Sequence, residues 1–446
     1  MSADPVRWVW AALTVALWIA GTVWIAWRAR RGPAAQPVAG ETLIVVASQT
    51  GFGDELAEMT RAAVAESGLA TRIATFADVG VDDLQSAGRV LFIASTTGEG
   101  DAPDSAAGFV RKSMRDDLDL AGVRYGLLAL GDRTYQDFCG FGRALDGWLA
   151  DGGATALFDR IEVDGGDALA LEHWREALAR LTGSAAAADW SLPAYSSWRL
   201  VERRLMNPGS PGEGAWRLAF EPDGHAPSWV AGDIAEIGIP TADGELTHRE
   251  YSVASLPSDG RAEFLVRLMR RPDGTPGLGS GWLTEGMAVG AMASMRIRTN
   301  RAFHGPTPET PMILIGNGTG IAGLRAHLKA RAACAAAGPA WLLFGERTQG
   351  CDSFYDEDLR AWLADGILTR LDRTFSRDPG DGRYVQALIA AAAEEVAAWV
   401  ADGASVYVCG SLEGMAGGVQ SALEAVLGAE VCQALVEAGR YRRDVY

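Results

Sequence analysis

The chain has 446 residues, of which 48% are hydrophobic and 54 are glycine. This length allows two or three domains with sizeable cores, and the composition is that of a globular protein rich in tight turns. The formal net charge of −17 argues against a nucleic-acid partner, because a phosphate backbone requires a basic surface. The five cysteines are scattered without any Cys-x-x-Cys spacing, so we predict neither a disulfide framework nor a metal site.

The N-terminal region, residues 1–31, differs from the rest of the chain. Twenty residues from Trp8 to Trp27 carry no charge, and a helix of that length crosses the ~30 Å hydrocarbon core of a membrane. Arginines follow this run, so the positive-inside rule predicts a single-pass protein of the inner (plasma) membrane, with the later domains in the cytoplasm and a linker over 32–41. A cleaved signal peptide is the alternative, although the apolar run exceeds the usual ~7–15 residues.

The next region, residues 42–184, opens with an apolar run over 42–47, which leads into a loop of small and hydroxyl-bearing residues and then a helical pattern. This order places hydroxyls and backbone N–H groups at a helix N-terminus, where a phosphate is stabilised without Lys or Arg. A monophosphate is therefore the expected ligand. The loop consists of Ser48, Gln49, Thr50, Gly51, Phe52 and Gly53.

Two more apolar runs in this region, 90–94 and 125–130, end in similar loops. Because an open α/β sheet binds its ligand at the carboxyl ends of parallel strands, the three loops predict a doubly wound parallel sheet with one binding site. They resemble the flavodoxin-like FMN domain of diflavin reductases. By that resemblance the first loop holds the FMN phosphate, the other two flank the isoalloxazine, and Tyr135 stacks on the ring. The residues implied in these two loops are Ser95, Thr96, Thr97, Gly98, Leu130, Gly131, Asp132, Tyr135, Phe138 and Cys139.

Two details of this resemblance bear on the flavin's surroundings. Thr97 stands where animal cytochrome reductases have Tyr, which leaves one face of the flavin less shielded. Three acidic residues near this loop either form a docking rim around the flavin or belong to a solvated loop. They are Glu99, Asp101 and Asp104.

Two domains are expected after a linker over 185–197. Residues 198–308 show short apolar runs punctuated by Gly and Pro, which is typical of a small antiparallel β-barrel. Residues 309–446 begin with an apolar run over 312–315, a glycine turn and a helix pattern, an order that places a pyrophosphate over a helix N-terminus. This last region is therefore predicted to be a nucleotide-binding α/β domain.

Both regions resemble the ferredoxin–NADP reductase superfamily. The resemblance implies that Arg249 contacts the FAD pyrophosphate, that Tyr251 lies against the flavin ring and that Ser252 reaches the N5 region. The implied FAD ligands are Arg249, Glu250, Tyr251 and Ser252, together with the second pyrophosphate loop of Gly277, Leu278, Gly279 and Ser280.

The expected nucleotide is NADPH, because a 2′-phosphate needs cations and hydroxyls where an NAD site supplies an acid. The residues predicted for this site are Gly318, Thr319, Gly320, Ser376, Arg377, Arg383, Tyr384 and Gln386. By resemblance, Cys409 packs on the nicotinamide, Asp444 balances charge during hydride transfer and Tyr446 covers the FAD. The implied catalytic set is Ser252, Cys409, Asp444 and Tyr446; the alternative for the terminus is a charged tail free in solvent.

The resemblance to diflavin reductases, which include NADPH–cytochrome reductases and sulfite reductase flavoproteins, spans residues 42–446. Only residues 241–248 stand where those proteins insert a helical connecting domain, so the chain resembles a compact, membrane-anchored bacterial type. The implied function is electron transfer from NADPH to FAD, FMN and a one-electron acceptor. A haem protein is the expected acceptor; a ferric siderophore or other ferric complex and the sulfite reductase haem subunit are alternatives. A flavin-binding membrane sensor is the alternative that is not an enzyme.

Overall fold

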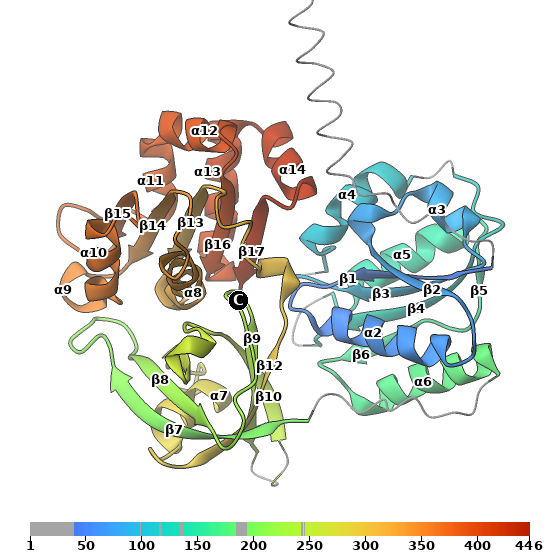
Figure 1. The fold of residues 1–446 in the computed structure, drawn as a ribbon, viewed down its shortest axis with the longest axis horizontal. Coiled ribbons are helices and arrows are strands. Elements are labelled where there is room, and N and C mark those ends of the chain that lie inside the picture. Colours follow the sequence, from blue (N-terminus) through green and yellow to red (C-terminus); the bar gives the residue numbers. More distant parts are fainter. Residues whose placement is uncertain are drawn as a thin grey trace, which may run out of the picture.

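The computed structural model describes residues 40–98, 100–115, 118–133, 137–183, 194–241, 244 and 246–446. These residues form three β-sheets with their own cores, and the chain ends near the junction of the three (Figure 1). The predicted transmembrane helix lies outside the described residues.

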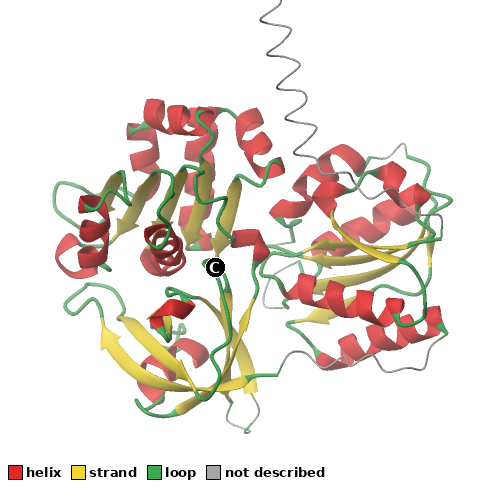
Figure 2. Cartoon of the chain, viewed as in Figure 1, coloured by secondary structure: helices red, strands yellow, loops and turns green. Residues whose placement is uncertain are grey.

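The first sheet is parallel and has strand order β2-β1-β3-β4-β5, with β6 also paired to β4. Its strands are β1 (Thr42–Ala47), β2 (Thr71–Thr75), β3 (Arg89–Ser95), β4 (Arg124–Gly131), β5 (Thr155–Ala156) and β6 (Ile161–Asp164). The helices are α2 (Phe52–Ala65), α3 (Val81–Ser86), α4 (Asp104–Ser113), α5 (Gly140–Asp151) and α6 (Ala168–Thr182). Helices α2 and α6 cover one face and α3, α4 and α5 the other (Figures 1 and 2).

Strand β1 shows why these strands are apolar along their whole length. Leu43 and Val45 point into the core under α3–α5, whereas Ile44 and Val46 point into the core under α2 and α6. Successive side chains of a strand face opposite sides, so a sheet that is covered on both faces needs a continuous apolar run. The predicted doubly wound parallel sheet is confirmed.

The second sheet is antiparallel, with strand order β10-β9-β12-β7-β8-β11, and curls around one core. Its strands are β7 (Ser196–Leu205), β8 (Ala215–Pro222), β9 (Ile234–Pro240), β10 (Leu246–Ser252), β11 (Ala262–Arg267) and β12 (Met292–Arg298). A short helix, α7 (Leu278–Gly281), continues into a wide turn over Trp282–Gly286 and closes one side of the core. Strand β7 begins at Ser196, inside the region predicted as a linker.

The third sheet is parallel, with order β15-β14-β13-β16-β17. Its strands are β13 (Met312–Asn317), β14 (Ala340–Glu346), β15 (Arg370–Phe375), β16 (Ser405–Gly410) and β17 (Tyr441–Val445). Its helices are α8 (Ile321–Ala332), α9 (Gln349–Asp352), α10 (Asp356–Ala364), α11 (Val385–Ala391), α12 (Ala393–Ala401), α13 (Gly417–Leu427) and α14 (Ala429–Glu437). Helices α8 and α10 cover one face and α11–α14 the other.

No single helix among the described residues is both long and apolar enough to cross a membrane. One bent pair, Leu412–Leu427 (which includes α13) and α14, meets that requirement by length and composition only, and it bends by 112° at the break. Val419 and Leu423 of α13 and Leu435 of α14 are buried against the third sheet, which accounts for their apolar character.

Candidate functional site

Three predicted residues from distant parts of the sequence meet on one carboxylate oxygen. Strands β16 and β17 pair in a register that places Cys409 opposite Asp444, and Ser252 ends β10 of the antiparallel sheet. The Ser252 hydroxyl donates to Asp444 Oδ2 at 2.6 Å, and the Cys409 thiol lies 3.7 Å from the same oxygen. We call Ser252, Cys409 and Asp444 the carboxylate cluster.

Burial controls the protonation of this cluster. It raises the pKa of the Asp444 carboxyl, while the hydrogen bond from Ser252 opposes that shift by favouring the charged form. Burial and the neighbouring Asp444 raise the pKa of the Cys409 thiol well above its usual value. Because only a thiolate is a strong nucleophile, Cys409 is suited to packing and weak hydrogen bonding and not to covalent catalysis.

The glycine turn between β13 and α8 lies directly against the cluster. A Cβ atom at Gly320 would lie 2.0 Å from the Cys409 carbonyl oxygen, so only glycine fits there. A Cβ at Gly323 would lie 3.2 Å from the Cys409 sulfur and 3.5 Å from Ser252 Cβ. Sequence reasoning did not assign Gly323 to the site, although its position one helical turn after Gly320 was a usable signal.

The C-terminal residue is fixed at the same turn. The Tyr446 amide donates to the Gly410 carbonyl at 3.1 Å, and the Leu412 amide donates to the Tyr446 carbonyl at 2.9 Å. The Tyr446 hydroxyl lies 3.1 Å from Thr319 Oγ1, yet the side chain is 55% exposed. The predicted alternative of a tail free in solvent is therefore wrong.

The residues predicted for FAD form a second cradle, between β10 and α7. A Cβ at Gly279 would lie 2.8 Å from Arg249 Cγ and 3.1 Å from the Tyr251 hydroxyl. Arg249 is exposed, and its guanidinium hydrogen bonds, within the described residues, only to Thr247 and the His248 carbonyl. A cation with spare donors beside a glycine loop fits a pyrophosphate.

The other predicted FAD residues make contacts within the protein. Ser280 Oγ accepts from the Met269 amide at 3.0 Å, so its hydroxyl fixes the loop. Leu278 packs against the core of the antiparallel sheet. The Gly277 carbonyl accepts from the Gly281 amide at 2.7 Å, within the turn that forms α7. Glu250 points away from Arg249, as strand alternation requires, and forms an ion pair with Arg298.

The loops of the first sheet also converge. Ser48 Oγ accepts from the Gly51 amide at 3.0 Å, and a Cβ at Gly53 would lie 3.3 Å from that oxygen and 3.4 Å from Ser95 Oγ. The Thr96 hydroxyl is buried and has no partner among the described residues, which fits a ligand between these loops. Gly98 has a φ of +55°, in the region that favours glycine.

Most residues predicted in the third loop stabilise the loop itself by packing. Phe138 and Cys139 are buried against Ala129, and the Arg133 guanidinium covers the Phe138 ring at 4.2 Å. A Cβ at Gly131 would lie 2.8 Å from the Cys139 amide nitrogen. Leu130 lies in the core beneath the sheet, and Asp132 directly follows the carboxyl end of β4. Tyr135 and Glu99 lie outside the described residues.

The residues predicted for the 2′-phosphate gather at the carboxyl end of β15. Arg377, Arg383 and Tyr384 are exposed there. The Ser376 amide is fixed by the Glu346 carbonyl at 2.8 Å, and Gln386 lies in α11. Sequence reasoning missed Asp381, whose carboxylate accepts from Arg383 Nε at 2.7 Å and whose pKa this hydrogen bond lowers.

Sequence reasoning also missed the contacts between the first sheet and the rest of the chain. Arg298 donates to the Thr50 carbonyl and hydroxyl at 3.0 and 3.2 Å. The Gln49 amide group donates to the Arg443 carbonyl at 3.3 Å, and Arg443 Nε donates to Asp104 at 2.8 Å. Asp104, predicted as part of an acidic rim, thus binds a cation of its own chain.

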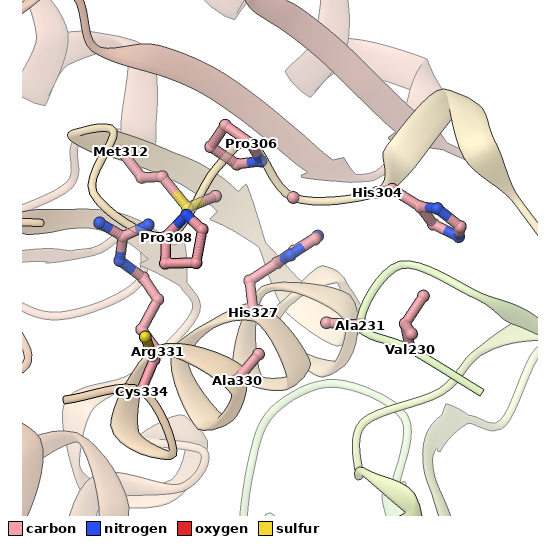
Figure 3. A pocket seen from close by; sticks show the side chains of 11 residues that line it. Val230, Ala231, His304, Pro306, Pro308, Met312, His327, Ala330, Arg331 and Cys334 are labelled. Carbon is pink, nitrogen blue, oxygen red and sulfur yellow. The ribbon is translucent and has the colours of Figure 1, made fainter. Parts of the chain in front are cut away.

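A cavity of about 290 Å³ lies apart from these residues, between α8 and the connector that precedes β13. His327 projects between Pro306 and Ala231 within it (Figure 3). Burial lowers the pKa of His327 to about 3, so the ring is neutral at physiological pH. None of the predicted site residues lines this cavity.

Comparisons with known proteins agree with this arrangement. Residues 44–174 match the flavodoxin family model, and residues 314–421 match the model of the oxidoreductase NAD-binding domain. The sulfite reductase [NADPH] flavoprotein alpha-component of Vibrio parahaemolyticus is 27% identical, with 96% of this chain and 92% of the relative covered. The proteins of the same name from Vibrio cholerae and Yersinia enterocolitica are 28% and 27% identical, covering 93% and 96% of this chain and 89% and 94% of the relatives.

These relatives correct the predicted localisation. They match nearly the whole chain under a name that describes a sulfite reductase component and no membrane protein. The described residues contain no single helix able to cross a membrane. The predicted location in the inner membrane is therefore wrong; it rested on residues 8–27 and the arginines that follow them, all of which lie outside the described structure.

The alignment to the Vibrio parahaemolyticus protein extends over 577 residues, more than this chain contains. The relative therefore carries a large segment that has no counterpart here. With a flavodoxin match, an NAD-binding match and an antiparallel sheet between them, the chain belongs to the diflavin reductase family.

Proposed function

We propose that the protein is an NADPH-dependent diflavin oxidoreductase that passes electrons from NADPH through FAD and FMN to a one-electron acceptor. The observation that carries this proposal is the contact between Gln49 and the Arg443 carbonyl, at 3.3 Å. Gln49 belongs to the predicted FMN phosphate loop, and Arg443 directly precedes Asp444 of the carboxylate cluster. In this proposal, the contact brings the two ends of the electron path together within one chain.

We assign the FMN site to the region 42–184, the FAD site to 198–308 and the NADPH site to 309–446. Bound FAD would take up the hydride of NADPH and release it as single electrons, which FMN would pass on. Arg249 and the loop around Gly279 would bind the FAD pyrophosphate. Tyr446 would cover the flavin, because its ring is held at the turn beside the cluster but remains exposed.

Asp444 is the residue we assign to charge stabilisation. The nicotinamide ring becomes positive as its hydride leaves, and a fixed carboxylate nearby stabilises that charge. Ser252 orients the carboxylate through its 2.6 Å hydrogen bond. Cys409 supports the arrangement as an uncharged, buried thiol.

The acceptor is proposed to be a haem protein with a basic surface, because the chain is strongly acidic. Relatives named as the flavoprotein component of an NADPH sulfite reductase favour the haem subunit of such an enzyme as a specific candidate. A ferric siderophore or other ferric complex remains the alternative. A flavin-binding sensor without turnover would not need a hydroxyl, a thiol and a carboxylate assembled at the nucleotide turn.

The first test is to purify the chain, quantify FMN and FAD, and follow flavin bleaching under anaerobic NADPH and NADH. Near-equal FMN and FAD with faster reduction by NADPH supports the proposal. One flavin alone, or no reduction by either nucleotide, overturns it. Adding a sulfite reductase haem subunit, cytochrome c or a ferric complex to the reduced protein then identifies the acceptor class.

A further inference from the structure

The predicted phosphate loop contains no cation of its own. Residues 48–53 include no Lys or Arg, and the first turn of α2 that follows carries Asp54 and Glu55. Burial raises the pKa of both carboxyls, which reflects their poor solvation. Hydroxyls and backbone N–H groups hold a phosphate at such a loop, and a cation from elsewhere in the chain would offset the repulsion from these two acids.

Arg298 of β12 supplies a guanidinium at this loop. Its side chain is 2% exposed, and its donors reach both the carbonyl and the hydroxyl of Thr50, at 3.0 and 3.2 Å. It also lies over the Phe52 ring at 5.8 Å. Because Thr50 Oγ1 accepts a hydrogen bond from Arg298, the hydroxyl hydrogen is directed elsewhere and can be donated to a phosphate oxygen.

The surroundings hold Arg298 in this position. Glu236 accepts from its Nη1 at 3.0 Å, and Glu250 forms an ion pair with its Nη2. The contact between the two sheets is close, since a Cβ at Gly51 would lie 2.0 Å from the Thr299 carbonyl oxygen. Arg298 therefore reaches the loop only while the flavodoxin-like part is docked on the antiparallel sheet.

We propose that Arg298 is a positioning residue that completes the FMN phosphate site across the boundary between the two parts of the chain. It orients the Thr50 hydroxyl toward the phosphate and places a guanidinium, itself paired with Glu236 and Glu250, at a loop that has no Lys or Arg. The proposal rests on the proposed function, which places FMN in this loop. It implies that FMN binds most tightly in the docked arrangement.

The test compares a ligand that has the phosphate with one that lacks it. The full-length protein is freed of FMN, and the dissociation constants of FMN and riboflavin are measured for the wild type and Arg298→Gln. We expect the variant to weaken FMN binding about tenfold and to change riboflavin binding by less than about twofold. Arg296→Gln is the matched control, because Arg296 is buried on the same strand and binds Glu55 and Glu236 without contacting the loop.

A double-mutant cycle with Thr50→Val then measures how far Arg298 and the Thr50 hydroxyl depend on each other in FMN binding. If Arg298 acts through the Thr50 hydroxyl, Arg298→Gln weakens FMN binding much less when Thr50 is already Val. Should Arg298→Gln lose FAD or fail to fold, Arg298→Lys keeps the charge beside Glu236 and is expected to weaken FMN selectively by a few-fold. FMN and riboflavin affinities that change equally, or not at all, overturn the inference. A wild type that binds neither flavin at this site overturns the proposed function instead.

Discussion

Two glycine turns of this protein, the loop over 48–53 and the turn over 318–320, each follow a parallel strand and lead into a helix, but they pack against different neighbours. At Gly51 a Cβ would lie 2.0 Å from the Thr299 carbonyl oxygen, which belongs to a different part of the chain. At Gly320 a Cβ would lie equally close, 2.0 Å, to the Cys409 carbonyl oxygen on the adjacent strand of the same sheet. The packing of the first turn therefore depends on docking of the flavodoxin-like part on the antiparallel sheet. The packing of the second turn depends on a strand of its own sheet.

This difference separates two kinds of function. The second turn packs on the Cys409 carbonyl of the adjacent strand of its own sheet, beside the proposed hydride-transfer cluster, which Ser252 joins from the antiparallel sheet. The first turn contacts Arg298 and Arg443 of the other two sheets, so these contacts exist only while the flavodoxin-like part is docked on the rest of the chain. Substitutions at the two glycines should therefore fail in different ways.

The largest effect is expected for Gly320→Ala. The added methyl group meets backbone of β16, which cannot move without disturbing the sheet, and such overpacking costs about 3 kcal/mol of unfolding free energy. NADPH should no longer reduce the protein at a measurable rate. Denaturant unfolding and anaerobic flavin bleaching measure the two effects. Gly417→Ala is the control, because a Cβ there has no neighbour within 4 Å; equal behaviour of the two variants would contradict the packing argument.

Asp444→Asn should lower the rate of flavin reduction by NADPH on the order of 100-fold, because the carboxylate charge is lost where positive charge develops. Burial raises the pKa of Asp444 above its usual 3.8, so the wild-type rate should rise with pH through that higher pKa. The rate of the variant should not show this rise with pH. A stopped-flow series at several pH values tests the prediction, and an unchanged rise in the variant would assign the titration to another group.

The same raised pKa has a consequence for stability. The Asp444 carboxyl is harder to deprotonate in the folded protein than in the unfolded chain, so the stability that follows is complete below the unfolded pKa and is lost as pH rises through the folded pKa. Asp444→Asn removes the group and should make unfolding less dependent on pH across that interval.

Gly51→Ala should leave reduction of FAD by NADPH unchanged and slow electron arrival at FMN about tenfold. Gly51 has a φ of +84°, which costs a residue with a side chain about 1–2 kcal/mol, and the methyl group also meets Thr299. Two-wavelength stopped-flow separates the two reductions. Gly68→Ala has a similar φ of +79° but open space around it, so it controls for backbone strain. Equal slowing in both variants would argue against the docking contact.

The sequence was sufficient to predict the parts of the fold that depend on local pattern. The strands over 42–47 and 312–315 were predicted because burial on both faces demands continuous apolar runs. The cluster of Ser252, Cys409 and Asp444 came from family resemblance, since no spacing along the chain shows that three distant residues share one oxygen.

Contacts between parts were not predictable in this way. Alternation along β12 places Arg296 and Arg298 on one face, but nothing local shows which other part that face meets. The membrane localisation was wrong for a related reason. It relied only on the apolarity of one segment, residues 8–27, and on the arginines that follow it in the sequence.

The smallest effect is expected for Arg443→Gln, which tests the link between the two turns. Arg443 binds Asp104 of α4 through its side chain and Gln49 through its carbonyl, so the variant loses the ion pair but keeps the backbone contact. A partly exposed pair contributes little, and we expect interflavin transfer to slow about threefold at low salt. Because salt screens such pairs, the wild type should slow toward the variant as ionic strength rises, whereas the variant should change little.

Asp104→Asn should reproduce this behaviour, and the double variant should be no slower than either single one. A salt response that is the same in all four proteins would mean that the ion pair does not hold the parts together and that docking depends on other contacts, such as those of Arg298 with Thr50 and of Arg296 with Glu55.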